Sequence, residues 1–293
     1  MATIGTGRAN GSCSLLHAAG IGYGASLALD LKVIVRLLDS PGRKEIDDPD
    51  ELFPAIIEAW TNSGYKLPAG DIHWSVNSKI PPRQGLKSSS AICVAAIKAL
   101  CEATDTELED HQIVDIATIA QLSSGVSLTG SIDDSWAAIS GGWKLIDINA
   151  ESASSGVIME ASGPVSEDWR VFIVLRGERE QRPELDSFSF HRQAFSQAVS
   201  ALQEGQELVA LTWNGRGVIG AVNDGRGRIL TNDAFVNGAR AAGISGSGSA
   251  IVIFAPSISE PICNRILSWY GKFDDLEIIE TSIINSINTD NEE

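Results

Sequence analysis

The chain has 293 residues, of which 43% are hydrophobic and 20% are charged, so it can bury one large core or two of medium size. Its formal net charge of -16 argues against binding nucleic acid or an anionic membrane over a broad surface. The sequence shows no N-terminal leader and no apolar run near the ~20 residues that span a bilayer. We therefore expect a soluble, cytoplasmic protein with neither nucleic-acid nor membrane partners.

The four cysteines are far apart in the sequence, at Cys13, Cys93, Cys101 and Cys263. They form no C-x-x-C pair, and no histidine follows at a spacing typical of a zinc site. Free thiols in a reducing compartment are the expected state.

The first half of the chain alternates strand signals with helix signals. Period-two patterns predict strands over residues 6–16, 25–38 and 71–80. Apolar residues at helical spacing predict helices over residues 50–63, 90–103 and 109–122. A further short helix should begin near Asp133 and end at Gly141 and Gly142, because glycine favours helix termination.

The second half shows the same mixture of elements. Strands are predicted over residues 143–148, 156–161, 170–175, 250–254 and 276–281. Helices are predicted over residues 189–204, 207–223, 232–241 and 259–269. A serine-rich passage over residues 151–156 marks the expected boundary between halves, and the polar tail 285–293 is expected to fray. The pattern predicts an α+β or two-layer α/β architecture.

The most informative segment is the loop Pro81-Pro82-Arg83-Gln84-Gly85-Leu86-Lys87-Ser88-Ser89-Ser90-Ala91, which joins a predicted strand to a predicted helix. The first turn of a helix leaves backbone N–H groups without intrahelical partners, and Lys87 adds a positive charge beside them. Together they predict a phosphate site. An ordinary serine-capped helix after a turn is the alternative interpretation.

Two further motifs are ambiguous when taken alone. The adjacent carboxylates Asp133 and Asp134 are typical of a helix start, yet kinases also need a carboxylate to orient the attacking hydroxyl. The turn Gly243-Ile244-Ser245-Gly246-Ser247-Gly248-Ser249 is more often a hairpin than a ligand site.

The order of the three motifs resembles the GHMP kinase superfamily of small-molecule kinases, whose loop reads Pro-x-x-x-Gly-Leu-Gly-Ser-Ser-Ala. Within that superfamily, Lys87 in place of the middle glycine resembles the archaeal shikimate kinases. So do residues 129–135, which lead to Gly141 and Gly142, and residues 20–31.

The resemblance implies a two-domain α+β fold, with domains over residues 1–155 and 156–293 and an active site in the cleft between them. It implies an ATP-dependent kinase that phosphorylates the 3-hydroxyl of shikimate in aromatic amino-acid biosynthesis. ATP, Mg2+ and shikimate are the expected ligands, and a homodimer is compatible with the resemblance.

The resemblance also assigns roles to residues. ATP would contact the loop and the late glycine turn through Pro82, Arg83, Gln84, Gly85, Leu86, Lys87, Ser88, Ser89, Ser90, Ala91, Gly246 and Gly248. Ser89 would touch magnesium, directly or through water. The catalytic aspartate, which would orient the hydroxyl and accept its proton, would be Asp134, the favoured choice, if counted from Gly141, and Asp133 if the preceding Ile-Asp pair is aligned.

The sequence departs from the superfamily at one metal position. Some relatives carry a magnesium-binding glutamate about eleven residues before the catalytic aspartate, where this chain has Ser123, with Gln121 and Ser124 beside it. His17 stands at a position where a polar residue is usual, and it either faces substrate or packs inside.

Shikimate carries a carboxylate, which calls for an arginine or lysine in its pocket. The candidates are Arg8, Lys32, Arg176, Arg179 and Arg240, and Arg176 is singled out because it follows a predicted strand and precedes Gly177.

Two alternatives remain open. One is another kinase of the superfamily, for homoserine or mevalonate, although homoserine kinases generally lack the catalytic aspartate. The other is a non-catalytic sensor that binds a nucleotide or metabolite, which the retained loop and carboxylates disfavour.

Overall fold

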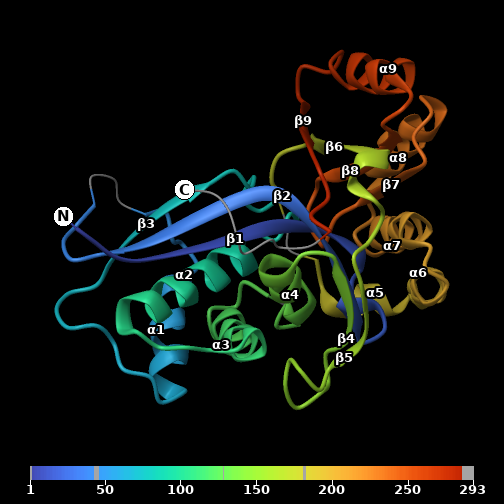
Figure 1. The fold of residues 1–293 in the computed structure, drawn as a ribbon. Coiled ribbons are helices and arrows are strands. Elements are labelled where there is room, and N and C mark those ends of the chain that lie inside the picture. The colour runs from blue at the N-terminus through green and yellow to red at the C-terminus, as the bar shows by residue number, and fades with distance from the viewer. Residues whose placement is uncertain (1, 43–45, 128, 181–182, 286–293) are drawn as a thin grey trace.

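The structure is a computed structural model that describes residues 2–42, 46–127, 129–180 and 183–285. Within these residues the strands form two antiparallel sheets (Figure 1). The first sheet contains β1 (Thr3–Leu16), β2 (Tyr23–Leu38), β3 (His73–Ser78), β4 (Trp143–Asp147) and β5 (Val157–Ala161). The second contains β6 (Trp169–Leu175), β7 (Ala241–Ile244), β8 (Ile251–Pro256) and β9 (Glu277–Thr281), in the order β7-β8-β6-β9.

The helices divide between the two sheets. Four lie together beneath β1 and β2, namely α1 (Leu52–Asn62), α2 (Ser88–Thr104), α3 (Asp110–Ser123) and α4 (Ile132–Ser140) (Figure 1). The second half contributes α5 (Leu185–Ser189), α6 (Arg192–Gln203), α7 (Glu207–Ala221), α8 (Gly225–Val236) and α9 (Glu260–Tyr270). Short 3-10 turns occupy residues 18–20 and 166–168. The arrangement confirms the predicted α+β class.

One predicted helix lies in the wrong place. The pattern over residues 232–241 predicted a helix, but α8 begins at Gly225, and Ala241 opens strand β7. Asp224 explains the early start, because its side chain accepts a hydrogen bond from the backbone N–H of Gly227 at 2.7 Å and so caps the helix. The two glycines of the first turn hid this start from a propensity argument.

The predicted boundary between residues 155 and 156 falls inside the β4–β5 hairpin, so by sheet membership the second half begins later, near Trp169. Residues 282–284 also return to the first sheet. Asp30 N–H donates to the carbonyl of Ser282, and Ile284 N–H donates to that of Ala28. The returning segment lies along β2 between its contacts with β3 and β4. The predicted tail beyond residue 285 lies outside the described residues.

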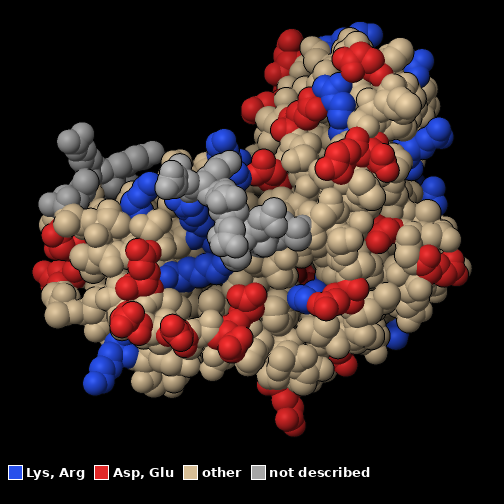
Figure 2. Space-filling view, in the orientation of Figure 1, with Lys and Arg blue, Asp and Glu red and all other residues tan. Residues whose placement is uncertain are grey.

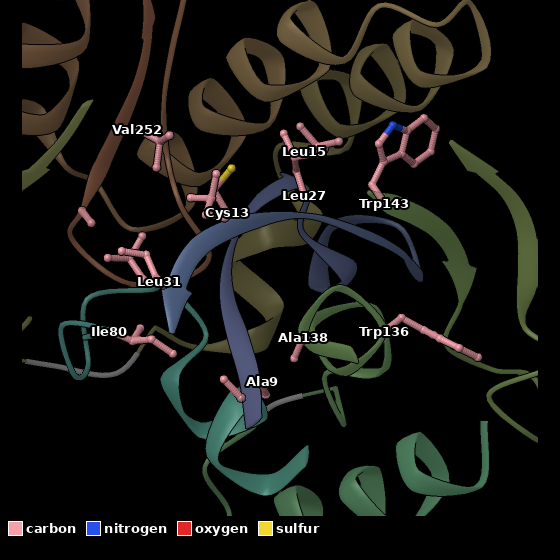
Figure 3. Close-up of a cluster of buried hydrophobic side chains, with 14 of the residues drawn as sticks. Ala9, Cys13, Leu15, Leu27, Leu31, Ile80, Trp136, Ala138, Trp143 and Val252 are labelled. Carbon is pink, nitrogen blue, oxygen red and sulfur yellow. The ribbon is translucent and has the colours of Figure 1, made fainter. Parts of the chain in front are cut away.

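The two halves share a continuous core. The buried cluster includes Cys13 and Leu15 from β1, Trp143 from β4 and Val252 from β8 (Figure 3). The four cysteines are free thiols, as expected. Acidic side chains are spread over both halves on the face drawn in Figure 2. Among the described residues, no helix is both long and apolar enough to cross a bilayer.

Helix α2 packs against β1 at a distance that only glycine allows on the strand. A methyl group at Gly7 would lie 1.8 Å from the carbonyl oxygen of Ala95, and one at Gly5 would lie 2.1 Å from that of Ala99. The alanine-rich helix and the glycine-containing strand therefore pack closely against each other. This contact fixes the position of α2 relative to β1, and with it the position of the loop that precedes α2.

We predict that Gly7→Ala destabilises the protein by about 1–3 kcal/mol, because the added methyl overpacks the contact between β1 and α2. The midpoint of urea unfolding should fall accordingly. Gly225→Ala is the matched control, since a methyl group there meets nothing within 4 Å and should leave the midpoint unchanged or raise it. Equal midpoints for both variants would contradict this account.

Candidate active site

A cavity of about 600 Å³ opens between the two halves of the chain. Its lining includes His17 from the end of β1, Lys87 and Ser89 from the start of α2, Asp134 from α4, and Arg179 and Gly246 from the second half. The three motifs identified in the sequence therefore meet in one place. This is the cleft that the resemblance implied.

The loop before α2 has a backbone shape suited to an anion. Gly85 and Lys87 have left-handed φ angles of 88° and 66°, as does Arg83 at 56°. Lys87 is the N-cap residue of the 17-residue helix α2, yet its side chain makes no capping hydrogen bond. Ser88 and Ser89, in the first turn, line the cavity. The unpartnered N–H groups expected at a helix start thus lie at a cavity wall.

The predicted nucleotide contacts divide into two sets. Residues that line the cavity are Pro82, Arg83, Gly85, Lys87, Ser88, Ser89, Gly246 and Gly248. Gln84, Leu86, Ser90 and Ala91 are not part of the lining. Leu86, Ser90 and Ala91 are almost fully buried, so they hold the loop rather than face the cavity.

The late glycine turn holds this loop from the second half of the chain. Gly85 carbonyl accepts a hydrogen bond from Ser245 Oγ at 2.7 Å, and Gln84 carbonyl accepts one from Ala250 N–H at 3.0 Å. A methyl group on Gly248 would lie 2.1 Å from the carbonyl carbon of Gln84. Gly246 donates its N–H to Ser14 Oγ, so this amide is not available to a ligand. At this position the turn can only let a ligand come close to its backbone.

Two arginines hold the turn in place. Arg176 Nε donates to the carbonyl of Ser249 at 2.6 Å, and its guanidinium contacts both carboxylate oxygens of Asp224. Arg179 Nε donates to the carbonyls of residues 247 and 248, and its Nη2 lies 2.9 Å from Asp224 Oδ2. Asp224 therefore anchors both cations, and its pKa is well below the usual range: burial opposes this shift, but the arginine hydrogen bonds outweigh it.

Lys87 does not stand free beside the loop, as the sequence suggested, because it forms a buried ion pair. Its Nζ lies 2.8 Å from Asp134 Oδ1, with 12% and 7% of the two side chains exposed. Burial alone would lower the pKa of Lys87, but the carboxylates of Asp134 and Asp133 outweigh it and raise that pKa. A charged pair is therefore built into the cavity wall.

The two adjacent aspartates have different surroundings, although both are at least 95% buried. For Asp134, burial would raise the pKa, but the charge and hydrogen bond of Lys87 bring it below the usual range. For Asp133, burial and then the charge of Asp134 raise the pKa to about 8, against the pull of Lys87. Asp134 is thus the ionised partner.

Ser26 is a member of this site that sequence reasoning did not single out. It lies on β2, fully buried, and its Oγ contacts Asp133 Oδ2 at 3.0 Å and Asp134 Oδ1 at 2.5 Å. The segment 20–31 was noticed as part of a resemblance, but no spacing pattern connects residue 26 with residues 133 and 134. Only the pairing of distant elements brings them together.

Gln121, rather than Ser123, points inward where relatives carry a magnesium-binding glutamate. Ser123 is exposed, whereas Gln121 is fully buried. Its Oε1 accepts from Ser90 Oγ at 2.7 Å, and its Nε2 donates to Ser135 Oγ at 3.1 Å. The amide therefore ties α2 and α4 together through α3. Among the described residues, no group of three or more His, Cys, Asp or Glu side chains could hold a metal ion.

His17 lines the cavity as a neutral group. Its Nδ1 accepts a hydrogen bond from Ala19 N–H at 3.2 Å, and its ring lies on Phe188 with centroids 4.6 Å apart. Burial, together with the nearby charge of Lys87, lowers its pKa to about 3. With Nδ1 accepting, the proton of the neutral ring is on Nε2.

Of the five basic residues proposed for a substrate carboxylate, Arg179 alone lines the cavity. Arg176, which sequence reasoning singled out, has its side chain turned to Asp224 and the carbonyl of Ser249 instead. Arg179 is itself paired with Asp224 through Nη2. Two other cations of the lining also have acidic partners: Lys87 is paired with Asp134, and Arg83 with Asp50 and Glu178.

Comparisons with known proteins agree with this geometry. Residues 54–142 match the family description "GHMP kinases N terminal domain". A shikimate kinase from Methanothermobacter thermautotrophicus is 28% identical, covering 96% of this chain and 96% of its own length. One from Methanobrevibacter smithii is 25% identical, covering 95% and 96%.

Solved structures of similar fold include kinases and mevalonate diphosphate decarboxylases by name. Mevalonate kinase from Methanococcus jannaschii superposes with a TM-score of 0.75 at 15% identity, covering 95% of this chain and 98% of that one. A putative homoserine kinase from Listeria monocytogenes gives a TM-score of 0.65 at 20% identity, covering 96% and 97%. At these identities the likeness shows the fold.

The lowered pKa of His17 predicts a loss of stability in acid. Between pH 6.5 and about 3 the unfolded chain binds a proton at this residue that the folded chain does not, so the free energy of unfolding falls as the pH falls. One such proton contributes a slope of about 1.4 kcal/mol per pH unit. His17→Asn keeps a capping side chain and should reduce the slope by about that amount in urea unfolding. An unchanged slope would contradict a neutral, buried His17.

Proposed function

We propose that this chain, which has the GHMP kinase fold and carries a GHMP kinase N-terminal domain, is an ATP-dependent kinase that phosphorylates the 3-hydroxyl of shikimate. The observation that carries the proposal is the meeting of an uncapped helix start with an ion-paired, buried carboxylate in one cavity. Phosphoryl transfer needs little more from a protein than these groups, since positioning and electrostatics dominate its catalysis.

The nucleotide phosphates would lie at the start of α2, against the N–H groups of Ser88 and Ser89. The hydroxyl of Ser89 suits a magnesium ion that ATP brings, because Mg2+ is usually held by one or two protein oxygens together with phosphate oxygens and water. When bound, the ion would neutralise charge that develops on the phosphates. The loop is held rigidly by Ser245 and Ala250, so the phosphates would meet a fixed surface.

Asp134 is the proposed base. It would orient the substrate hydroxyl and accept its proton as the new oxygen–phosphorus bond forms and the bond to the leaving ADP oxygen breaks. Lys87 keeps Asp134 ionised and supplies a positive charge close to the reacting oxygen. A base of low pKa serves this reaction, because the attacking hydroxyl becomes acidic only as it bonds to phosphorus.

The choice of shikimate is supported by the relatives of matching length, which are named shikimate kinases. Arg179 is the proposed partner of the substrate carboxylate, and neutral His17 is a donor for one of its hydroxyls. Mevalonate is the second candidate acceptor, because the fold of a mevalonate kinase superposes over 95% of this chain. A coupled assay of ADP release with shikimate, mevalonate and homoserine decides among them. Tight ATP binding with no turnover of any would favour a sensor.

We expect Asp134→Asn to reduce turnover of shikimate at least about a thousandfold, while the dissociation constant for ATP changes little. The amide keeps the shape of the side chain but cannot accept the proton. Turnover is measured by ADP release, and nucleotide affinity by calorimetry. Unchanged turnover would remove Asp134 from the reaction.

We expect Arg179→Lys to raise the KM for shikimate by about 10–100-fold, the worth of one charge-assisted hydrogen bond, with the KM for ATP within about threefold of wild type. Lysine keeps the charge, but its single nitrogen cannot hold Asp224 and the turn carbonyls while it binds a substrate carboxylate, as the several nitrogens of a guanidinium can. Arg240→Lys is the matched control, because Arg240 is exposed and outside the cavity lining. If the KM for ATP rises instead, Arg179 acts on the nucleotide, directly or through the glycine turn that it holds, and is not the partner of the substrate carboxylate.

A further inference from the structure

The two contacts of Ser26 with Asp133 and Asp134 require that one of the two acids carries a proton. Its hydroxyl lies between two carboxyl groups, at 3.0 Å from Asp133 Oδ2 and 2.5 Å from Asp134 Oδ1. A serine hydroxyl has one hydrogen to donate and two lone pairs that accept. It can therefore donate to one of the two carboxylates but not to both.

The acid to which Ser26 does not donate must itself supply the hydrogen of its contact with Ser26 Oγ. If both acids were ionised, one carboxylate oxygen would face a lone pair of Ser26 Oγ inside the protein, where unpaired polar contacts are costly. If one acid is protonated, it donates to Ser26 Oγ, and Ser26 in turn donates to the other acid. All three groups then have partners in a chain of two hydrogen bonds.

The surroundings decide which acid holds the proton. Asp134 Oδ1 also accepts the ion pair of Lys87 at 2.8 Å, which favours the ionised form. Within the part of the chain that the structure describes, no ion pair joins Asp133 to a cation. Asp133 lies against β2, where a methyl group on Gly24 would be 2.6 Å from Asp133 Oδ1. Neutral His17 is a further titratable group near Asp134, and Cys13, whose burial raises its pKa to about 12, lies near Lys87.

We propose that Ser26 is a positioning residue that makes Asp133 and Asp134 share one proton, so that Asp133 stays neutral and Asp134 stays the ionised base. The raised pKa of Asp133 and the lowered pKa of Asp134 agree with this division. The choice between the two aspartates, which counting along the sequence left open, then follows from hydrogen-bond donors alone. Ser26 touches neither substrate nor nucleotide in this scheme; it acts by fixing the direction of the Asp134 carboxylate.

A protonated Asp133 should make turnover sensitive to alkaline pH. Above a pH of about 8 Asp133 would lose its proton, and two adjacent carboxylates would compete for one serine hydrogen and one lysine. Asp134 would lose its fixed orientation, so turnover should fall as the pH rises. Asp133→Asn mimics the neutral acid, since its amide can donate to Ser26 Oγ, and it should lack this alkaline fall.

The role in turnover rests on the proposed kinase activity, so the first readout does not use activity. Infrared spectra of the full chain at pH 7 should show the carbonyl stretch of a protonated carboxylic acid. Asp133→Asn should remove this band, and Asp134→Asn should remove it too, because the proton is shared only when both acids are present. If the wild-type chain has no such band, the inference is wrong, whatever the substrate.

The second readout separates the two acids by turnover. We expect Asp133→Asn to lower kcat for the accepted substrate by less than about tenfold, against at least about a thousandfold for Asp134→Asn. Ser26→Ala should lower kcat by about 10–100-fold, the worth of a hydrogen bond to a charged group, and move the alkaline fall to lower pH. Ser26→Thr, which keeps the hydroxyl, should restore both.

The outcomes distinguish this inference from the proposed function. A carboxylic acid band that both amide variants lose, without turnover of any of the three acceptors, would keep the shared proton and reject the kinase. Turnover with an equal loss in Asp133→Asn and Asp134→Asn would keep the kinase and reject the division of roles. An unchanged pH profile in Ser26→Ala would likewise reject the positioning role.

Discussion

The buried ion pair between Lys87 and Asp134 is the interaction on which the site depends. It joins the residue that starts α2 to the first turn of α4, so it fixes the distance from the loop to the carboxylates. Two charges in a nearly buried place are costly unless each has further partners. Asp134 has such a partner in Ser26. Removing either charge would leave the other unpaired.

A second set of contacts keeps the loop in register with the other half of the molecule. The turn that starts at Ser245 holds Gln84 and Gly85, and the turn itself is held by Arg176, Arg179 and Asp224. None of these three charged residues needs to touch a ligand to affect binding. The helix start can present its N–H groups to the cavity because its loop is supported from behind.

Much of the fold and the centre of the site could be predicted from the sequence. The loop before α2 has glycine at a left-handed position and serines in the first helical turn, which are local signals with local causes. Asp133 and Asp134 were also identified from a local signal, a pair of adjacent carboxylates at the start of a helix. Strand and helix periods located most elements, and failed at α8, where glycines begin the helix and Asp224 caps it.

The rest could not be predicted because it depends on pairs that are distant in the sequence. From the sequence Lys87 was interpreted as a phosphate ligand, because its ion pair with Asp134 cannot be seen there. Arg176 had a suitable position after a strand, but Asp224 and the carbonyl of Ser249 bind its side chain. Ser26 acquires its proposed role only because β2 packs against α4. Such roles arise from tertiary contacts, which no local pattern encodes.

The return of residues 282–284 to the first sheet bears on how the protein is made. These residues pair with Ala28 and Asp30 in the middle of β2, about 250 positions earlier in the chain. On the ribosome, β2 therefore emerges long before its neighbour on that edge is synthesised, and a stretch of its backbone stays without that partner meanwhile. The half that carries the loop and the two aspartates completes its sheet only after the other half has been translated. A nascent chain halted before residue 282 would expose this edge to other strands, including those of a second nascent chain.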